Sequence, residues 1–360
     1  MATRREFLAG ASAACLTTGI ASTFAARETP RLVSAARLGQ DDGGVVWAAD
    51  RLASFKLPAR GHAPVRLTGG RVLVMGRRPG LFASIVDPDD LAAASSFESA
   101  GNSRFSGHAA LPPDGSTLVT GEFDADTFAA ALVVRDPARG AERVRWQPGG
   151  IEPHEVVFAR SGARLVVALG GLIKDGGVSG PAFNPGGIHS AVLELDPLSG
   201  KTLARHMLAP SLSPLSLRHL AVAPDGETIA VAAQDQDITQ TRPLVGLLRL
   251  GKGLELLPWP DPRECDFRSY VGSVAISGDC LAAAGPRGSV LGFWSVRSGH
   301  WIGALAMADA CGVTAATESG GFWASSGHGG IAKIAVDARG PRVEAQWHVD
   351  AGFDNHLLAI

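Results

Sequence analysis

Hydrophobic residues along this chain occur in short runs separated by turn-forming residues. Three segments repeat the same order of an apolar strand, a Gly-containing turn and a second apolar strand: His108–Val119, Glu155–Val166 and His219–Ala230. Short apolar runs bounded by Gly, Pro, Asp or Ser are typical of β-strands joined by tight turns. Each segment is therefore predicted to form an antiparallel hairpin.

Weaker copies of the same pattern occur at Val65–Val74, Val271–Ala283 and Gly312–Ala324. Several hairpins are followed by a third apolar run, such as Val290–Val296, and then by a Gly-bearing turn into a fourth, such as Arg297–His300. Four short antiparallel strands in each repeated unit are typical of a propeller blade.

The spacing of the repeats predicts the number of blades. Unit starts fall at an average interval of about 49 residues, at His62, His108, His154 or Glu155, His219, Val271, Gly312 and His356. The last unit has room for one strand only, so we expect the N-terminal segments 31–38, 44–49 and 51–57 to supply the others. An all-β, seven-bladed β-propeller of four-stranded antiparallel blades is predicted, its first blade closed by both chain ends. A pair of β-sandwiches, a β-helix, and propellers of six or eight blades are the alternatives.

Composition narrows the class of protein. Of the 360 residues 46% are hydrophobic and 19% are charged, which excludes a disordered or coiled-coil chain. The net charge of -2 leaves no basic field for a nucleic acid or an anionic membrane. Beyond residue 25 no apolar run has the length of about 18 residues that a membrane span requires. We expect a monomer with no nucleic-acid partner and no membrane span.

The N-terminus resembles an export signal. Arg4 and Arg5 are followed by Phe7-Leu8, a weakly apolar stretch and small residues that end at Ala25. This order is typical of a twin-arginine signal peptide, which is read by a receptor and removed. We predict a signal at residues 1–25, a single propeller domain at residues 26–360, and a periplasmic mature protein.

The remaining cysteines and several missing motifs limit the chemistry. Cys265, Cys280 and Cys311 are an odd number for an oxidising compartment, so at least one thiol stays unpaired within the chain. Cys311 could join a metal site or pair with Cys265. The sequence has no C-x-x-C, no phosphate-binding G-x-x-x-x-G-K-[ST] and no G-x-S-x-G, which argues against thioredoxin-like, P-loop and serine hydrolase chemistry.

The histidines have the most specific placement. In a propeller the first strand of each blade lines the central channel. Four of the predicted first strands carry a histidine at the same register: His62, His108, His219 and His356. Glu155 has this register in another blade, and His154 lies one position before it. Neutral imidazoles beside a carboxylate suit Fe, Zn or Cu. The five histidines are therefore candidate metal ligands at the channel mouth, and Glu155 is a candidate ligand-binding residue.

Two other interpretations of this register stay open. The histidines could be structural, each hydrogen-bonded within its own blade or the next one. Alternatively, arginines before the same strands could bind a carboxylate or phosphate; these are Arg60, Arg104, Arg218 and Arg268. The arginines could equally pair with Glu152, Asp350 and Asp354.

Several segments resemble one bacterial family. The segments Leu215–Ala221, Glu152–Glu155 and Phe105–His108, together with the twin-arginine leader, are similar to the family catalogued as domain of unknown function fifteen-thirteen. The resemblance spans nearly the whole mature chain and implies an exported propeller of the YVTN or WD type. It also implies a role near iron acquisition, because genes of that family tend to lie beside those of imelysin-like and dihaem-oxidoreductase-like proteins. Such proteins are the expected partners.

Two functions follow from these observations. The first is a non-catalytic binding propeller that docks a partner protein or a metal-bearing ligand at its upper face. The second is a metal-dependent enzyme of the propeller lactonase or oxidoreductase kind, with a metal at the channel mouth and a histidine or Glu155 as its base. No complete catalytic constellation is present, so no reaction is assigned.

Overall fold

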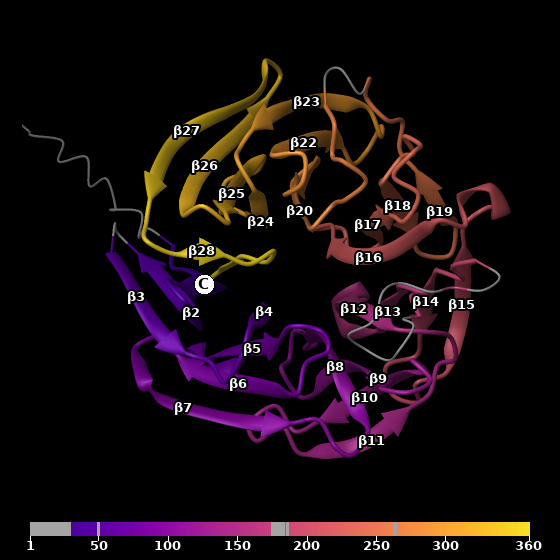
Figure 1. Ribbon diagram of the computed structural model, residues 1–360. Helices are drawn as coiled ribbons and strands as arrows, with labels where there is room; N and C mark the ends of the chain where they lie inside the picture. Colours follow the sequence, from indigo (N-terminus) through magenta and orange to yellow (C-terminus); the bar gives the residue numbers. More distant parts are fainter. Residues whose placement is uncertain (1–29, 49–50, 174–183, 185–186, 262–264) are drawn as a thin grey trace, which may run out of the picture.

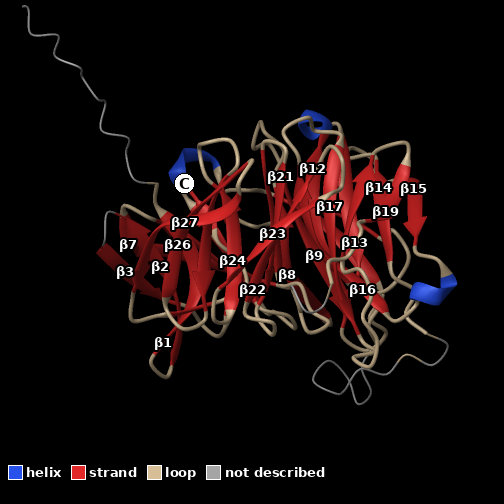
Figure 2. Ribbon diagram, turned by 90° about the horizontal axis from the view of Figure 1, so that it is seen from above, coloured by secondary structure: helices blue, strands red, loops and turns tan. Residues whose placement is uncertain are grey.

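Seven antiparallel sheets are arranged radially around one axis in the computed structural model (Figure 1). The structure describes residues 30–48, 51–173, 184, 187–261 and 265–360. Seen from the side, the loops gather at the two faces of the ring (Figure 2). The predicted seven-bladed propeller of four-stranded blades is confirmed. The predicted signal at residues 1–25 lies outside the described residues.

Blade 1 contains both ends of the chain. Its strands are β1 (Leu32–Leu38), β2 (Asp41–Ala48), β3 (Arg51–Lys56), β28 (Gly352–Phe353) and β29 (Leu358–Ala359). Both β28 and β29 pair with β1, so they form the two halves of one inner strand. Arg31 and Ile360 exchange backbone hydrogen bonds of 3.2 and 2.8 Å. The predicted closure of the first blade by both chain ends is therefore confirmed.

The other six blades each consist of four consecutive strands, with the first one innermost. Blades 2 to 4 are β4 (Gly61–Arg66), β5 (Val72–Gly76), β6 (Phe82–Asp87), β7 (Asp90–Glu98); β8 (Ser103–Ala110), β9 (Leu118–Asp124), β10 (Ala130–Arg135), β11 (Glu142–Trp146); and β12 (Pro153–Ala159), β13 (Arg164–Leu169), β14 (Ala191–Leu195), β15 (Thr202–Met207). Blades 5 to 7 are β16 (Leu215–Val222), β17 (Thr228–Asp235), β18 (Val245–Arg249), β19 (Gly253–Leu256); β20 (Ser273–Ser277), β21 (Cys280–Gly285), β22 (Val290–Ser295), β23 (Trp301–Ala306); and β24 (Ala310–Ala315), β25 (Gly321–Ser326), β26 (Gly330–Asp337), β27 (Gly340–His348).

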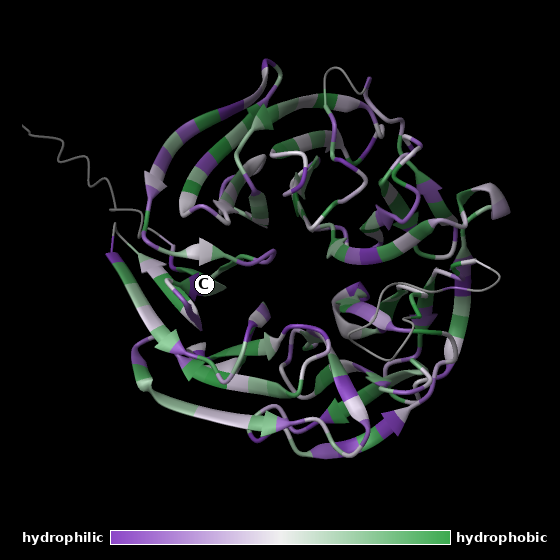
Figure 3. Cartoon of the chain, viewed as in Figure 1, coloured by the Kyte–Doolittle hydropathy of each residue, from purple (hydrophilic) through white to green (hydrophobic). Residues whose placement is uncertain are grey.

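Burial explains the hydrophobic pattern of the strands. A middle strand such as β14 is covered by neighbouring blades on both faces, and all of its residues are buried. An outer strand such as β15 alternates half-buried and exposed residues, as expected where one face meets solvent. Figure 3 shows the hydrophobic residues along the strands of every blade. The core consequently lies between adjacent blades rather than at the centre of the ring.

Packing of tryptophan rings closes the propeller. Trp47 of blade 1 packs against Trp323 and Trp347 of blade 7, with ring centroids 5.7 and 5.1 Å away, which joins the first blade to the last. The predicted hairpin turns contain glycines with positive φ, such as Gly115 (64°) and Gly226 (68°), a conformation that other residues rarely adopt. No helix in the described part of the chain is long and apolar enough to cross a bilayer.

Candidate metal centre

A β-bulge accompanies the histidine of four inner strands. The pairing register of β4, β8, β12 and β16 with the next strand shifts at His62, His108, His154 and His219. A bulge places an extra residue in one strand and re-aims its side chains. Here each bulge interrupts the ladder where an imidazole turns into the channel. His356 lies in the corresponding interruption of blade 1, between β28 and β29.

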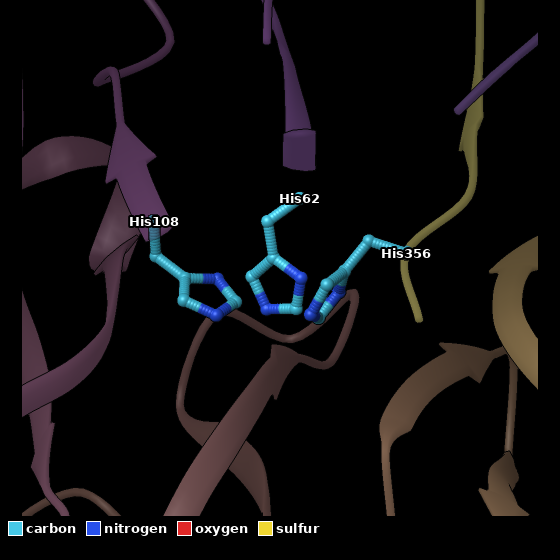
Figure 4. A group of neighbouring side chains, drawn as sticks. All are labelled: His62, His108 and His356. Atoms are coloured by element: carbon cyan, nitrogen blue, oxygen red, sulfur yellow. The ribbon is translucent and has the colours of Figure 1, made fainter. Parts of the chain in front are cut away.

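The five imidazoles form one cluster, called here the histidine cluster: His62, His108, His154, His219 and His356. Adjacent ring centroids are 4.5 Å apart for His62 and His356, 4.7 Å for His108 and His356, and 5.1 Å for His154 and His219. Figure 4 shows three of the rings converging. His62, His108, His154 and His219 are at most 5% exposed. The cluster lies in the channel: His62 and His154 are the second residues of β4 and β12, whereas β8 and β16 begin several residues before their histidines.

Carboxylates orient most of the rings. His62 Nδ1 lies 2.6 Å from Asp354 Oδ1, and His154 Nδ1 lies 3.2 Å from Glu152 Oε1. Glu155 lies beside two rings: its Oε2 is 3.1 Å from His219 Nδ1, and its Oε1 is 3.7 Å from His108 Nδ1. An Nδ1–H that donates to a carboxylate leaves Nε2 with a free lone pair, which is the arrangement found around metal-bound histidines.

Three Nε2 atoms have no partner. Those of His108, His219 and His356 are buried and lack a hydrogen bond among the described residues. His62, His108 and His356 offer ligand atoms within 4.8 Å of one another, as do His108, His154 and His219. The two sets share His108, which is therefore the centre of the cluster.

The protonation states favour metal binding. Burial, together with the charges of neighbouring groups, lowers the pKa of His108, His154, His219 and His356 well below 6.5. Burial also lowers the pKa of His62, although Asp354 opposes this effect. These imidazoles are neutral near pH 7 and can donate a lone pair. Burial raises the pKa of Glu155 to about 8, against the hydrogen bond from the Leu220 N–H.

Two cavities of the channel region border the cluster. One of about 490 Å³ is lined by His108, Glu155 and His356 together with apolar residues such as Val156 and Leu357. Another of about 510 Å³ is lined by polar groups that include Arg60, Asp354 and Cys311. Asp354 is the partner of His62, so each cavity reaches groups that belong to the cluster or contact it.

The predicted anion-binding arginines have different surroundings. Arg60 donates to Asp354 (Nε to Oδ2, 2.9 Å), which is the ion pairing that the sequence left open. Arg104 donates to the Ser103 carbonyl, and Arg268 is exposed. Among the described residues neither has a hydrogen bond or ion pair with the histidine cluster. Arg218 is 8% exposed, and its charge is among the causes that lower the pKa of His154 and His219.

Sequence reasoning missed two arginines and the role of two carboxylates. Arg77 contacts Asp354 at 2.8 Å, and Arg78 pairs with Glu152. The sequence suggested Asp354 and Glu152 as partners for arginines but not as the groups that orient His62 and His154. The signal that could have identified Arg77 and Arg78 is their position at the end of β5, directly beside the inner strand of blade 2.

Other predicted features fall near the cluster without joining it. Cys311 carries a free, buried thiol 3.6 Å from Asp309 and belongs to neither histidine set. It therefore forms no disulfide with Cys265. The segment between β13 and β14 lies mostly outside the described residues, but its Leu172 donates its N–H to Glu152 Oε2 (3.2 Å).

Solved structures share the architecture of this chain. A chain of Kuenenia stuttgartiensis hydrazine synthase is 16% identical, with a TM-score of 0.60, over 79% of this chain and 86% of that one. A chain of the mitotic checkpoint complex is 12% identical, with a TM-score of 0.58, over 80% and 79%. The Swd1 β-propeller domain of Myceliophteria thermophila is 15% identical, with a TM-score of 0.58, over 81% and 89%. At such low identity these similarities establish the fold alone.

Comparison at the level of sequence gives one result. No curated protein matches the chain. A family model covers residues 55–360, from the third strand of blade 1 to the C-terminus. This chain belongs to the family described as protein of unknown function DUF1513.

Proposed function

We propose that this protein is a binding propeller that holds one transition-metal ion, Fe, Zn or Cu, in the histidine cluster. The observation that carries the proposal is the set of three buried Nε2 atoms without partners, on His108, His219 and His356. A buried polar atom that lacks a hydrogen bond costs about 1–3 kcal/mol. Three such atoms in one cluster destabilise the folded protein unless a ligand binds to their lone pairs.

The donor set supports this choice of metal. Five neutral imidazoles are nitrogen donors, which suit borderline ions such as Zn, Cu and Fe rather than Mg or Ca. The carboxylates on the Nδ1 atoms fix the tautomers and strengthen the imidazoles as donors. A purely structural role would satisfy both nitrogens of each buried ring, and it leaves the three Nε2 atoms unexplained.

The place of action is part of the same proposal. The twin-arginine motif at Arg4 and Arg5 supports export in the folded state, which allows a metal to be acquired before translocation. The family resemblance supports a periplasmic role in iron acquisition, with an imelysin-like or dihaem-oxidoreductase-like protein as partner. In this proposal the propeller is the scaffold, and a face of the ring meets the partner.

One observation favours an enzyme as the second candidate. Glu155 contacts His219, lines the 490 Å³ cavity, and has its pKa raised to about 8 by burial. A carboxyl group with such a pKa beside a metal could exchange protons with a substrate in the cavity. This candidate requires the same metal, so the metal is tested first.

The test is metal binding by the purified mature protein. We expect the metal-stripped chain to bind Zn, Cu or Fe with a stoichiometry near one, and to lose this binding when His108 and His219 are both changed to Ala. His300→Ala is the control, because His300 is exposed on the loop that leads to β23. Absence of stoichiometric binding, with no thermal shift for any of the three metals, would reject the proposal.

Export and docking have separate tests. Replacement of Arg4 and Arg5 by Lys should retain the precursor in the cytoplasm, whereas periplasmic maturation of that variant would contradict the twin-arginine route. For the partner, affinity-tagged protein from iron-starved cells should recover an imelysin-like or dihaem-oxidoreductase-like protein. Recovery of neither from intact periplasm would count against docking.

A further inference from the structure

We propose that the histidine cluster has an adjoining anion site, in which Arg218 holds a planar carboxylate- or carbonate-type oxyanion next to the metal. This inference rests on the proposed function for the metal itself. The anion site is defined by Arg218 and Tyr270. No other candidate in the described residues combines a buried cation that lacks a partner with a position beside the cluster.

Arg218 is a buried cation without a carboxylate partner. Its side chain is 8% exposed, and its buried Nε has no hydrogen bond. No ion pair of Arg218 with a carboxylate occurs in the part of the chain that the structure describes. An unpaired charge in the protein interior is strongly unfavourable. A bound anion would remove this cost.

The carboxylate that acts on Arg218 already has other partners. Glu152 pairs with Arg78, lies 3.2 Å from His154 Nδ1, and accepts the N–H of Leu172. It acts on Arg218 electrostatically, and the charges of Arg78 and Arg77 oppose it. The negative charge of Glu152 is therefore shared among several donors and does not neutralise Arg218.

The whole region has more cations than anions. Arg60 and Arg77 both bind Asp354, and Arg78 binds Glu152, while Glu155 contacts His108 and His219. Arg218 is therefore the fourth guanidinium beside three carboxyl groups. A divalent metal in the cluster would add further positive charge. An anion at Arg218 would offset both contributions, so the metal and the anion should each strengthen the binding of the other.

Arg218 is adjacent to a histidine of the cluster along β16. Arg218 precedes His219 within one bulge of β16, where the ladder is interrupted between Leu217 and Leu220. The charge of Arg218 lowers the pKa of both His154 and His219. An oxyanion held here could therefore reach an open coordination position of an ion bound by the imidazoles.

Tyr270 is a second possible donor for the anion. The Tyr270 oxygen accepts a hydrogen bond from Asn355 Nδ2 (2.6 Å), which leaves the hydroxyl hydrogen of Tyr270 to donate elsewhere. Tyr270 is among the groups that act electrostatically on Arg218. A guanidinium fork and a hydroxyl suit a planar carboxylate, which can accept two parallel bonds from arginine. Arg60 and Arg77, which both bind Asp354, are partly exposed to solvent.

The test measures the coupling between anion and metal. Zn affinity of the mature protein is compared in sodium chloride, hydrogencarbonate and acetate at equal ionic strength. We expect about a tenfold gain in affinity with at least one oxyanion. Hydrogencarbonate and acetate distinguish an inorganic anion from an organic carboxylate. Equal affinity in all three salts overturns the proposal.

Variants locate the site. Arg218→Met should keep Zn binding in chloride and lose the gain from the oxyanion. Tyr270→Phe removes only the hydroxyl and should reduce the gain in Zn affinity. This variant replaces Arg218→Met in the test if Arg218→Met does not fold. Arg268→Met is the matched control, because Arg268 is exposed, and it should retain the full gain. A full gain in both Arg218→Met and Tyr270→Phe rejects the site.

The two proposals fail differently. If the wild-type chain binds no metal, the proposed function fails, and the oxyanions are then titrated into the metal-free protein. Thermal stabilisation of the wild type but not of Arg218→Met would show that the anion site exists without the metal. Absence of stabilisation would reject the anion site as well.

Discussion

The channel differs between blades 1 to 5 and blades 6 and 7. Five consecutive blades each supply one imidazole, whereas the inner strands β20 and β24 of the other two blades contain no histidine. The inner strand β20 of blade 6 is paired regularly with β21 and has no bulge. The inner strand β24 of blade 7 has a bulge but carries Cys311 and Gly312 there. A bulge alone thus does not make the site; it requires a histidine at that position.

Small residues on one side give the imidazoles room on the other. A Cβ on Gly312 would lie 2.8 Å from the Leu357 nitrogen and 2.9 Å from the His356 carbonyl carbon. These are main-chain atoms that cannot move independently of the strand. The glycine of blade 7 therefore allows the chain to bring His356 into the cluster, so the two kinds of blade depend on each other.

The largest expected effect is acid destabilisation of the metal-free protein. The folded-state pKa values of His108, His154, His219 and His356 are lowered below 6.5, so their contribution to stability is complete above pH 6.5 and is lost as the pH falls. The loss is about 1.4 kcal/mol per pH unit for each histidine until its folded-state pKa is reached. Glu155, with its raised pKa, opposes this trend with one proton only.

Urea unfolding between pH 7.5 and 5.0 measures this dependence. His356→Gln removes one titrating imidazole. It should reduce the slope of the free energy of unfolding against pH by about one proton. His300→Gln, on the exposed loop that leads to β23, is the control. Equal slopes for the two variants would show that the cluster does not cause the acid sensitivity.

The next effect separates the shared histidine from the others. His108 belongs to both histidine sets, whereas His154 belongs to one. We expect His108→Ala to weaken Zn binding more than about 100-fold and His154→Ala to weaken it less. Titration against a chelator of known affinity gives both values. The reverse order would place the ion away from His108.

Removal of an orienting carboxylate should have a smaller effect. Glu155→Gln keeps the shape of the side chain but replaces the carboxyl group beside His108 and His219 with an amide. We expect Zn affinity to fall about 10- to 100-fold. Glu142→Gln, on the exposed outer strand β11, is the control. Unchanged affinity for Glu155→Gln would mean that the imidazoles do not depend on this carboxylate.

The glycine of blade 7 can be tested by stability. Gly312→Ala should lower the free energy of unfolding by about 1–3 kcal/mol, because the added methyl group meets the main chain of blade 1. Gly330→Ala in the same blade, where the nearest atom is the Ser326 Cβ at 3.3 Å, should cost less. Urea denaturation of both variants gives the difference, and equal losses would contradict the close contact.

The smallest effect is expected in blade 6. Ser273 Oγ accepts the N–H of Val313 at 3.2 Å and is outside the histidine sets. Ser273→Ala should cost about 1 kcal/mol of stability and leave Zn affinity unchanged. A marked loss of Zn binding would bring blade 6 into the site and remove the contrast between the two parts of the channel.

Much of the architecture could be predicted because its signals are local. The hairpins ending at Val119, Val166 and Ala230 carry their turns and apolar runs within a few residues, and their repetition revealed the blades. The histidines followed from the same alignment, since equivalent positions of equivalent blades meet at the axis. The register also identified His154 beside Glu155, although it did not show which of the two would face the cluster; the structure has His154 in it and Glu155 holding two of its rings.

The sequence by itself determined the repeat, the strand pattern and the register of histidines, because these depend on neighbouring residues along one chain. Only the tertiary structure decided that the imidazoles lie within the channel, that Asp354 of the C-terminal segment orients His62 from the neighbouring blade, and that Arg218 lacks a carboxylate partner among the described residues. Bulges, burial and charge balance arise where blades distant in sequence meet. Their energies depend on distances that no local pattern specifies.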